Sequence, residues 1–102
     1  EGVNKAEKIA TTNDVDLVFV GPADLGLALK AGAGEASDLE MHIAEVGRSS
    51  LRVGTAAGIH LSSAASLDEY IELGFTVFVM STDQAILAAG VNSFITEFRR
   101  QI

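Results

Sequence analysis

The sequence has no cysteine, no tryptophan and only one proline among its 102 residues. The absence of cysteine excludes disulfides, thiolate zinc sites, iron–sulfur clusters and cysteine nucleophiles. A chain without cysteine fits a reducing compartment, so we expect a cytoplasmic protein.

Long apolar runs and an excess of basic residues are also lacking. No stretch reaches the ~18 to 20 consecutive apolar residues of a membrane helix, and residues 1–14 are polar, without the hydrophobic region of a signal peptide. Seven Lys and Arg against 14 Asp and Glu give a net charge of −7, which repels nucleic-acid phosphate and anionic lipid. We therefore expect neither nucleic acid nor a membrane as a partner.

Apolar residues are plentiful, at 48% of the chain, and charged residues make up 21%. This composition is typical of a globular protein and excludes intrinsic disorder. The length allows one domain. The chain begins with Glu1 instead of Met, so we expect a processed chain or a piece of a longer one.

Three short runs of apolar, β-branched and aromatic residues predict strands over residues 16–20, 51–57 and 75–80. The first and third runs are apolar at successive positions instead of alternating with polar residues. This pattern is typical of parallel strands that are covered on both faces. We therefore expect a parallel sheet.

An amphipathic helix is predicted between the first two strands. Ser37 and Glu40 form a capping box, so this helix is expected to begin near Ser37 and to end around Gly47. Its apolar positions recur at helical spacing. They are Leu39, Ile43 and Val46.

Three further helices are predicted by apolar spacing and end signals. Ser66 and Glu69 form a second capping box, and Gly74 is expected to end the short helix that follows it. A long last helix is predicted over residues 83–100, and a first helix over residues 3–9. Strands and helices therefore alternate, as in a doubly wound sheet or a (β/α)8 barrel, although three strands complete neither.

The turn after the first strand is the most informative segment, because both architectures bind ligands at the carboxyl ends of their strands. Gly21 lets the backbone approach a ligand closely, Pro22 stiffens the turn, and Ala23 and Asp24 begin a short helix. Free amides at such a start can hold a carboxylate or phosphate, and the Asp24 carboxylate suits Mg²⁺ or Mn²⁺. The alternative is that Asp24 only stabilises its own helix.

The chain resembles the C-terminal half of the HpcH/HpaI aldolase family, metal-dependent pyruvate aldolases related to the citrate lyase β-subunit. The resemblance lies in residues 2–29, 58–60 and 69–87, with VDLVFVGPADL as its most specific element and ELGFTVFVMSTD in support. It implies an α/β fold, the C-terminal portion of a (β/α)8 TIM barrel with about three parallel strands. Residues 1–102 would form a single partial barrel domain.

The resemblance also implies a reaction. In that family a divalent cation (Mg²⁺, Mn²⁺ or Co²⁺) chelates pyruvate and stabilises its enolate. The metal-ligand role falls on Asp24, and the amides of Ala23 and Asp24 would hold the pyruvate carboxylate, with Gly21 permitting its approach. We expect retro-aldol cleavage of a 4-hydroxy-2-oxo acid to pyruvate and an aldehyde, in a homo-oligomer.

Several functional residues of the family have no counterpart in this chain. The second metal ligand, a glutamate, would fall just upstream of Glu1, and the catalytic histidine and an arginine belong to earlier strands. No catalytic residue is therefore assigned here, and the chain by itself is expected to be inactive.

The remaining polar candidates are expected to have structural roles. His60 lies just past the second predicted strand, where family members carry an apolar residue; we expect it to be solvated or hydrogen-bonded, with catalysis as the alternative. His42 lies in mid-helix and is expected to be structural. Asp83 belongs to the N-cap region of the last helix, although Ser81 and Thr82 also reach the ligand-binding edge.

Two segments have alternative interpretations. Residues 30–36 are expected to be a flexible loop, because no strand precedes Gly32 and Gly34 as a phosphate-binding loop requires. The apolar stripe over residues 87–98 is expected to be core, and the resemblance offers a helix swapped between subunits instead.

Two other functions remain open. A non-catalytic half-barrel could serve as an oligomerisation or interaction module, because an open three-stranded sheet exposes an edge and an apolar flank. A citrate lyase-like enzyme acting on CoA esters is less favoured, because only seven Lys and Arg are available to bind the nucleotide.

Overall fold

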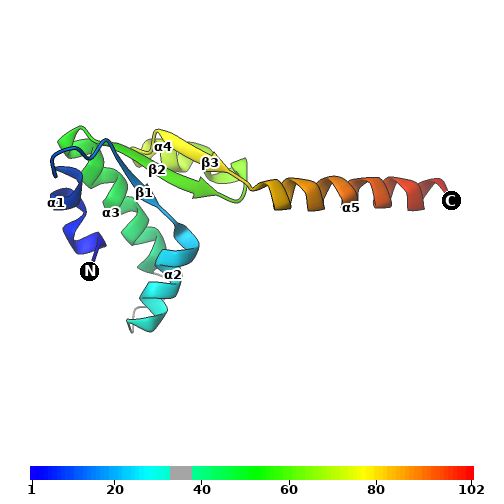
Figure 1. Cartoon of the computed structure of the whole chain (residues 1–102), viewed down its shortest axis with the longest axis horizontal. Helices are drawn as coiled ribbons and strands as arrows, with labels where there is room; N and C mark the ends of the chain where they lie inside the picture. The colour runs from blue at the N-terminus through cyan, green and yellow to red at the C-terminus, as the bar shows by residue number, and fades with distance from the viewer. Residues whose placement is uncertain (33–37) are drawn as a thin grey trace.

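The computed structural model describes residues 1–32 and 38–102. A parallel sheet of three strands, in the order β1-β2-β3, lies at its centre (Figure 1). The strands are β1 (Leu17–Val20), β2 (Ala56–Leu61) and β3 (Val77–Met80). The helices are η1 (Val3–Lys5), α1 (Ala6–Ala10), α2 (Pro22–Ala31), α3 (Asp38–Val53), η2 (Ala64–Ser66), α4 (Leu67–Glu72) and α5 (Asp83–Gln101). The predicted order of helices and strands, including a helix ahead of the first strand, is confirmed.

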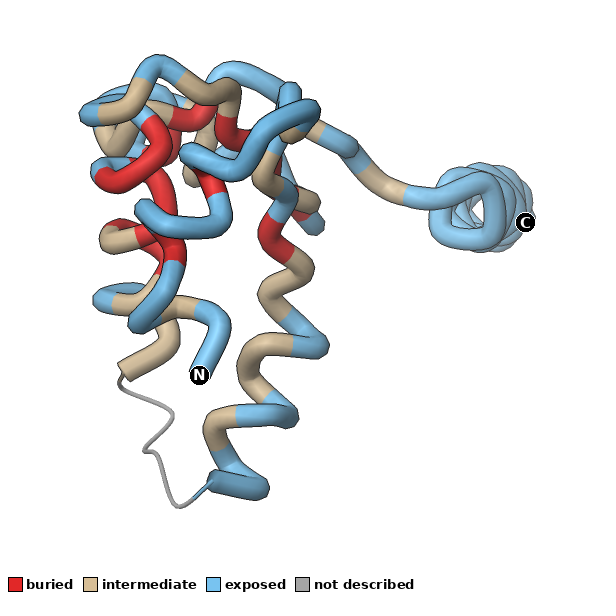
Figure 2. Tube along the Cα trace, turned by 60° about the vertical axis from the view of Figure 1, so that its left-hand side comes forward, coloured by how far each residue is buried: buried red, intermediate tan, exposed pale blue. Residues whose placement is uncertain are grey.

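A hydrophobic core lies between one face of the sheet and the helices α1, α3 and α4. Figure 2 shows the buried residues gathered in the body of the chain, away from its C-terminal end. Alternate residues of β2 point into it: Ala57, Ile59 and Leu61 are all buried. The other members are Ala6, Val20, Ile43, Val46, Tyr70 and Phe75. Removal of this apolar surface from water is the main term that stabilises the body.

The opposite face of the sheet is uncovered in the described part of the chain. Leu17, Phe19, Val77 and Val79 are 39% to 46% exposed there. Phe19 pairs with Gly58, and Gly58 pairs with Val77. A Cβ on Gly58 would lie 2.8 Å from Phe19 Cδ2 and 3.3 Å from Val77 Cβ, so these residues share that face. In a closed barrel this face would line the interior.

The second strand runs over Ala56–Leu61, so the prediction of residues 51–57 is wrong. Residues 51–53 are the last turn of α3, and Leu51 is 66% exposed. Leu51 and Val53 are apolar and precede small residues, and this pattern is also typical of the start of a strand. Their helical conformation comes from continuity with the long amphipathic helix before them.

Helix α3 also passes Gly47, its predicted end. A Cβ on Gly47 would lie 2.5 Å from the carbonyl oxygen of Leu73, so this glycine allows a close approach and does not end the helix. The end comes at Gly54, where φ is +75°, and the Thr55 N–H donates to the Ser50 carbonyl at 3.0 Å. The predicted start near Ser37 lies outside the described residues.

The second predicted capping box is replaced by a different cap. Ser63 Oγ accepts a hydrogen bond from the Ala65 N–H at 3.1 Å and caps η2, which precedes α4. Ser66 then has near-helical backbone angles (φ −98°, ψ 6°), and its side chain makes no cap hydrogen bond. Gly74 follows α4 with φ +102°, which confirms it as the end signal.

Helix α5 extends away from the body (Figure 1), and all of its residues are exposed (Figure 2). Thr82 Oγ1 accepts from the Ala85 N–H at 3.1 Å, and Asp83 Oδ1 accepts from the Gln84 N–H at 2.8 Å. These bonds confirm Asp83 as part of the N-cap region. The expectation that residues 87–98 are core is wrong for the described part of the chain, where no other element covers them. No helix among residues 1–32 and 38–102 has the length and apolar character to span a membrane.

Candidate active site

The turn after β1 has the predicted local structure. Gly21 is extended (φ −98°, ψ 98°) and occupies the N-cap position, with Pro22 at the first position of α2. Proline suits this position, because its fixed φ matches the helix and its missing N–H would have had no partner there. The helix that follows is ten residues long and reaches Ala31, so the predicted loop at residues 30–36 begins too early. Gly32 follows the helix as its C-cap, and residues 33–36 of that loop, including Gly34, lie outside the described residues.

Two backbone N–H groups of this turn have no partner among the described residues. Helical hydrogen bonding in α2 begins with the Leu25 N–H, which donates to the Gly21 carbonyl at 2.9 Å. The N–H groups of Ala23 and Asp24 precede that bond and make none of their own within the described chain. They are therefore available to an anion at the positive end of the helix dipole.

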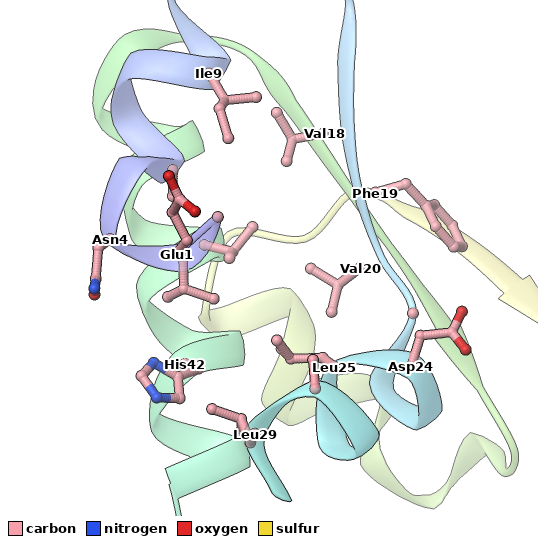
Figure 3. Close-up of a pocket in the computed structure, with 16 residues that line it drawn as sticks. Glu1, Asn4, Ile9, Val18, Phe19, Val20, Asp24, Leu25, Leu29 and His42 are labelled. Carbon is pink, nitrogen blue, oxygen red and sulfur yellow. The ribbon is translucent and has the colours of Figure 1, made fainter. Parts of the chain in front are cut away.

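The Asp24 carboxylate lies beside Gly21 and is exposed. A Cβ on Gly21 would lie 3.4 Å from Asp24 Oδ2, and within the described chain no hydrogen bond or ion pair involves this carboxylate. Figure 3 shows Asp24 and Phe19 on one side of β1, and Val18 and Val20 on the other. The carboxylate therefore stands at the carboxyl end of β1 on the uncovered face of the sheet. A stabilising effect on α2 through the helix dipole needs no hydrogen bond and is compatible with this position.

The carboxylate of Asp24 is the type of donor that a divalent cation prefers, but it supplies too few ligands by itself. Its carboxylate supplies hard oxygen ligands of the kind that Mg²⁺ and Mn²⁺ prefer. Within residues 1–32 and 38–102, no group of three or more His, Asp or Glu side chains gathers at one place. One carboxylate is too few for a protein metal site, so Asp24 fits only as one ligand of a larger set.

His60 lies inside β2, not just past the second strand as predicted. It pairs with Val79 and lies two residues beyond Gly58, so it belongs to the uncovered face near the carboxyl end of the strand. The ring is half-buried and has no hydrogen-bond partner among the described residues. Of the two expected roles, the partly exposed ring is compatible with the solvated one, and no hydrogen-bonded one is present within this part of the chain.

The carboxyl end of β3 has a feature that the sequence did not reveal. Ser81 has φ +69°, a conformation that costs free energy in a residue with a side chain. Its N–H donates to the Leu61 carbonyl at 3.3 Å, which holds the chain beside the end of β2. The only signal available in advance was its place directly after a predicted strand.

A hollow of about 550 Å³ lies on the other side of β1, against the helices. Figure 3 shows Val18, Val20 and Leu25 directed into it, with His42 across from Asp24. Asp24 reaches the edge of this hollow, but its carboxylate points away from the interior. The hollow is mainly apolar and lies on the opposite side of β1 from the Asp24 carboxylate.

The fold is that of part of a βα-repeat protein, an architecture that binds ligands at the carboxyl ends of its strands. The chain matches no protein-family model. It is 31% identical over 99 residues to a hydroxypyruvate/pyruvate aldolase of Paraburkholderia phytofirmans, covering 96% of this chain and 38% of that protein. It is 30% identical over 100 residues to a 5-keto-4-deoxy-D-glucarate aldolase of Klebsiella pneumoniae, covering 97% of this chain and 39% of that protein.

A solved structure gives the same result. A HpcH/HpaI aldolase/citrate lyase family protein from Burkholderia cenocepacia matches with a TM-score of 0.84 and 34% identity, over 96% of this chain and 38% of that chain. The resemblance to the HpcH/HpaI aldolase family is thereby confirmed, as is the α/β fold class with three parallel strands. The chain spans about two-fifths of the length of the relatives it matches.

Proposed function

We propose that this chain is the C-terminal part of a metal-dependent pyruvate aldolase that cleaves a 4-hydroxy-2-oxo acid to pyruvate and an aldehyde. The observation that carries the proposal is the turn after β1, where two N–H groups and a carboxylate without a partner among the described residues lie at the carboxyl end of the strand. The matched relatives are aldolases, which supports the same class of reaction.

The chain's own residues would bind and orient the 2-oxo acid. The N–H groups of Ala23 and Asp24 would donate to its carboxylate at the positive end of α2. Gly21 has no side chain, so the substrate could lie against the backbone there. This arrangement would hold the carboxylate and the adjacent keto oxygen in one orientation before the carbon–carbon bond breaks.

A divalent cation would supply the electrophilic chemistry: Mg²⁺, Mn²⁺ or Co²⁺ would stabilise the negative charge that develops on the keto oxygen. Asp24 would be one of its ligands. The remaining ligands and the base that moves the proton would come from parts of the protein outside the described residues.

The rest of the protein would complete the domain. Residues 1–102 would be one partial domain of a (β/α)8 barrel, and further strands would cover the face that bears Phe19 and Val79. We further propose a cytoplasmic homo-oligomer, in which a second copy would cover the apolar side of α5. No nucleic acid or membrane partner is proposed, given the net charge of −7.

The proposal is tested by assaying the full-length gene product for pyruvate release from 4-hydroxy-2-oxo acids. We expect EDTA to abolish activity and Mg²⁺, Mn²⁺ or Co²⁺ to restore it, while Asp24→Ala is inactive even with added metal. Activity that survives both EDTA and Asp24→Ala would contradict the proposal.

A non-catalytic interaction module is the second candidate, favoured by the exposed α5 and the uncovered sheet face. Thermal unfolding with and without metal separates the two functions. A catalytic site that binds Mn²⁺ and oxalate raises the melting temperature of the full-length protein, whereas a module of this kind shows no such linkage.

A further inference from the structure

Within the described strands, the uncovered face of the sheet contains one polar side chain, that of His60. Its other members are Leu17, Phe19, Ala56, Gly58, Val77 and Val79, as the strand pairing and the alternation of side chains define them. His60 is placed among them at the carboxyl end of β2, and it follows the Val20–Ile59 pair by one residue. It therefore lies on the strand next to the start of the Gly21–Asp24 turn.

The imidazole of His60 has no hydrogen-bond partner among the described residues, although it is half-buried. A polar group that closure of the barrel buries further without a partner would destabilise the fold. His42, the other histidine, is also half-buried but lies on α3, behind the opposite face of the sheet. Position, and not residue type alone, therefore singles out His60.

We propose that His60 contacts the aldehyde half of the substrate and selects an aldehyde that carries a hydroxyl group. This inference rests on the proposed aldolase function. The turn at β1 would hold the pyruvate half, so the neighbouring strand β2 faces the part of the substrate that becomes the aldehyde. His60 would be a specificity-determining residue and would take no part in moving the proton.

The chemistry of the imidazole favours a hydroxyl. A neutral imidazole has one donor and one acceptor nitrogen, and a hydroxyl can both accept and donate. An aldehyde with only carbon and hydrogen beyond its carbonyl would leave the ring unpaired beside apolar Val79. The site should therefore prefer glycolaldehyde to acetaldehyde as the acceptor for pyruvate.

The test compares kcat/KM for the addition of pyruvate to glycolaldehyde and to acetaldehyde, with the full-length enzyme and its metal. We expect the wild type to prefer glycolaldehyde, and His60→Leu to lower that preference by about fivefold to tenfold, the value of one neutral hydrogen bond. His60→Gln, which keeps a donor and an acceptor, should retain part of the preference. His42→Leu is the matched control and should leave the ratio unchanged.

A binding measurement supplements the kinetics. With oxalate in place of pyruvate no reaction occurs, so the binding of glycolaldehyde can be followed by NMR. Glycolaldehyde should shift the imidazole signals of His60, which are identified by their absence from the spectrum of His60→Leu. An unchanged aldehyde preference in both His60 variants, or a shift of the His42 signals only, would overturn the assignment.

Failure of the proposed function has a separate signature. If the wild type shows no metal-dependent exchange of the pyruvate methyl protons with solvent, the aldolase proposal fails and the role of His60 fails with it. Normal exchange together with an unchanged aldehyde preference contradicts only the role of His60.

Discussion

Two glycines of the same segment show how contacts decide the role of a residue. Gly47 lies in the middle of α3, where Leu73 and Phe75 come so close that no side chain fits. Gly54 lies at the end of the helix, where its positive φ turns the chain toward β2. In the sequence, both glycines look like possible helix ends. The contacts that distinguish Gly47 come from Leu73 and Phe75, which lie far along the chain.

Gly47→Ala should destabilise the protein. The new Cβ would lie 2.5 Å from the Leu73 carbonyl oxygen and 2.8 Å from Phe75 Cε2, and the backbone oxygen cannot move without the turn around it. We expect the free energy of unfolding in urea to fall by about 1–3 kcal/mol. Gly26→Ala in α2 is the control, since its Cβ would meet only Leu39 Cδ2 at 3.7 Å, and it should stabilise by about 0.5–1 kcal/mol. Equal losses in both variants would contradict the packing role.

The local structure of the candidate site could be predicted at the same scale, because its signal is local. Gly21, Pro22 and Asp24 specify the turn and the start of α2 through their own backbone preferences. The roles of Ala23 and Asp24 in binding remain predictions. His60 was misplaced because its position depends on where β2 begins.

Among the elements, limits with a local signal were predicted better than limits that depend on neighbouring elements. The start of α5 could be predicted because Thr82 and Asp83 cap it locally. The limits of β2 could not, because residues 51–53 have strand-like side chains and their conformation is imposed by α3. For α4, the expected cap at Ser66 was displaced by η2, whose own cap is Ser63.

Helices α3 and α4 are joined by Tyr70, whose hydroxyl donates to Glu40 Oε2 at 3.3 Å. Its ring also packs edge to face against Phe75, with centroids 5.8 Å apart. Burial first, and then the negative charge of Glu40, raise the pKa of Tyr70 above its ordinary value of 10.0. The folded protein therefore releases this proton less readily than the unfolded chain.

This pKa shift predicts a loss of stability at high pH. Because the pKa of Tyr70 is raised in the folded state, its protonated hydroxyl contributes to the free energy of unfolding. This contribution is complete below pH 10.0 and is lost as the pH rises through the higher pKa of the folded state. Above pH 10.0, the free energy of unfolding of the wild type should therefore fall more steeply than the free energy of unfolding of Tyr70→Phe. Parallel curves for the two proteins in urea unfolding would contradict the shift.

At the scale of the whole molecule, two apolar surfaces have no cover in the described chain. One is the sheet face with Phe19 and Val79, and the other is the apolar side of α5, with Phe94 81% and Phe98 64% exposed. Surfaces of this kind are unfavourable in water and mark contacts with other chain segments or subunits. The sequence identified both stripes as apolar, but apolar spacing alone does not specify what covers them.

If a second copy packs on α5, substitutions on the apolar side of this helix should lower the mass of the protein in solution. Phe94→Asp together with Phe98→Asp should dissociate the oligomer of the full-length protein, since central aromatic contacts often contribute about 2 kcal/mol or more each. Light scattering after size-exclusion chromatography measures the mass. Thr96→Asp, on the polar side of the same helix, should leave the mass unchanged. An identical mass for all three proteins would contradict the role of α5.

The metal-ligand role of Asp24 is tested by measuring Mn²⁺ binding to the full-length protein in the presence of oxalate, an analogue of the pyruvate enolate. We predict that oxalate tightens Mn²⁺ binding to the wild type. Asp24→Asn should weaken it by more than about 100-fold, since loss of even an outer partner of a metal ligand costs 10–100-fold. Asp68→Asn, an equally exposed carboxylate in α4, should have no effect. Equal Mn²⁺ affinity in the wild type and Asp24→Asn would contradict the account.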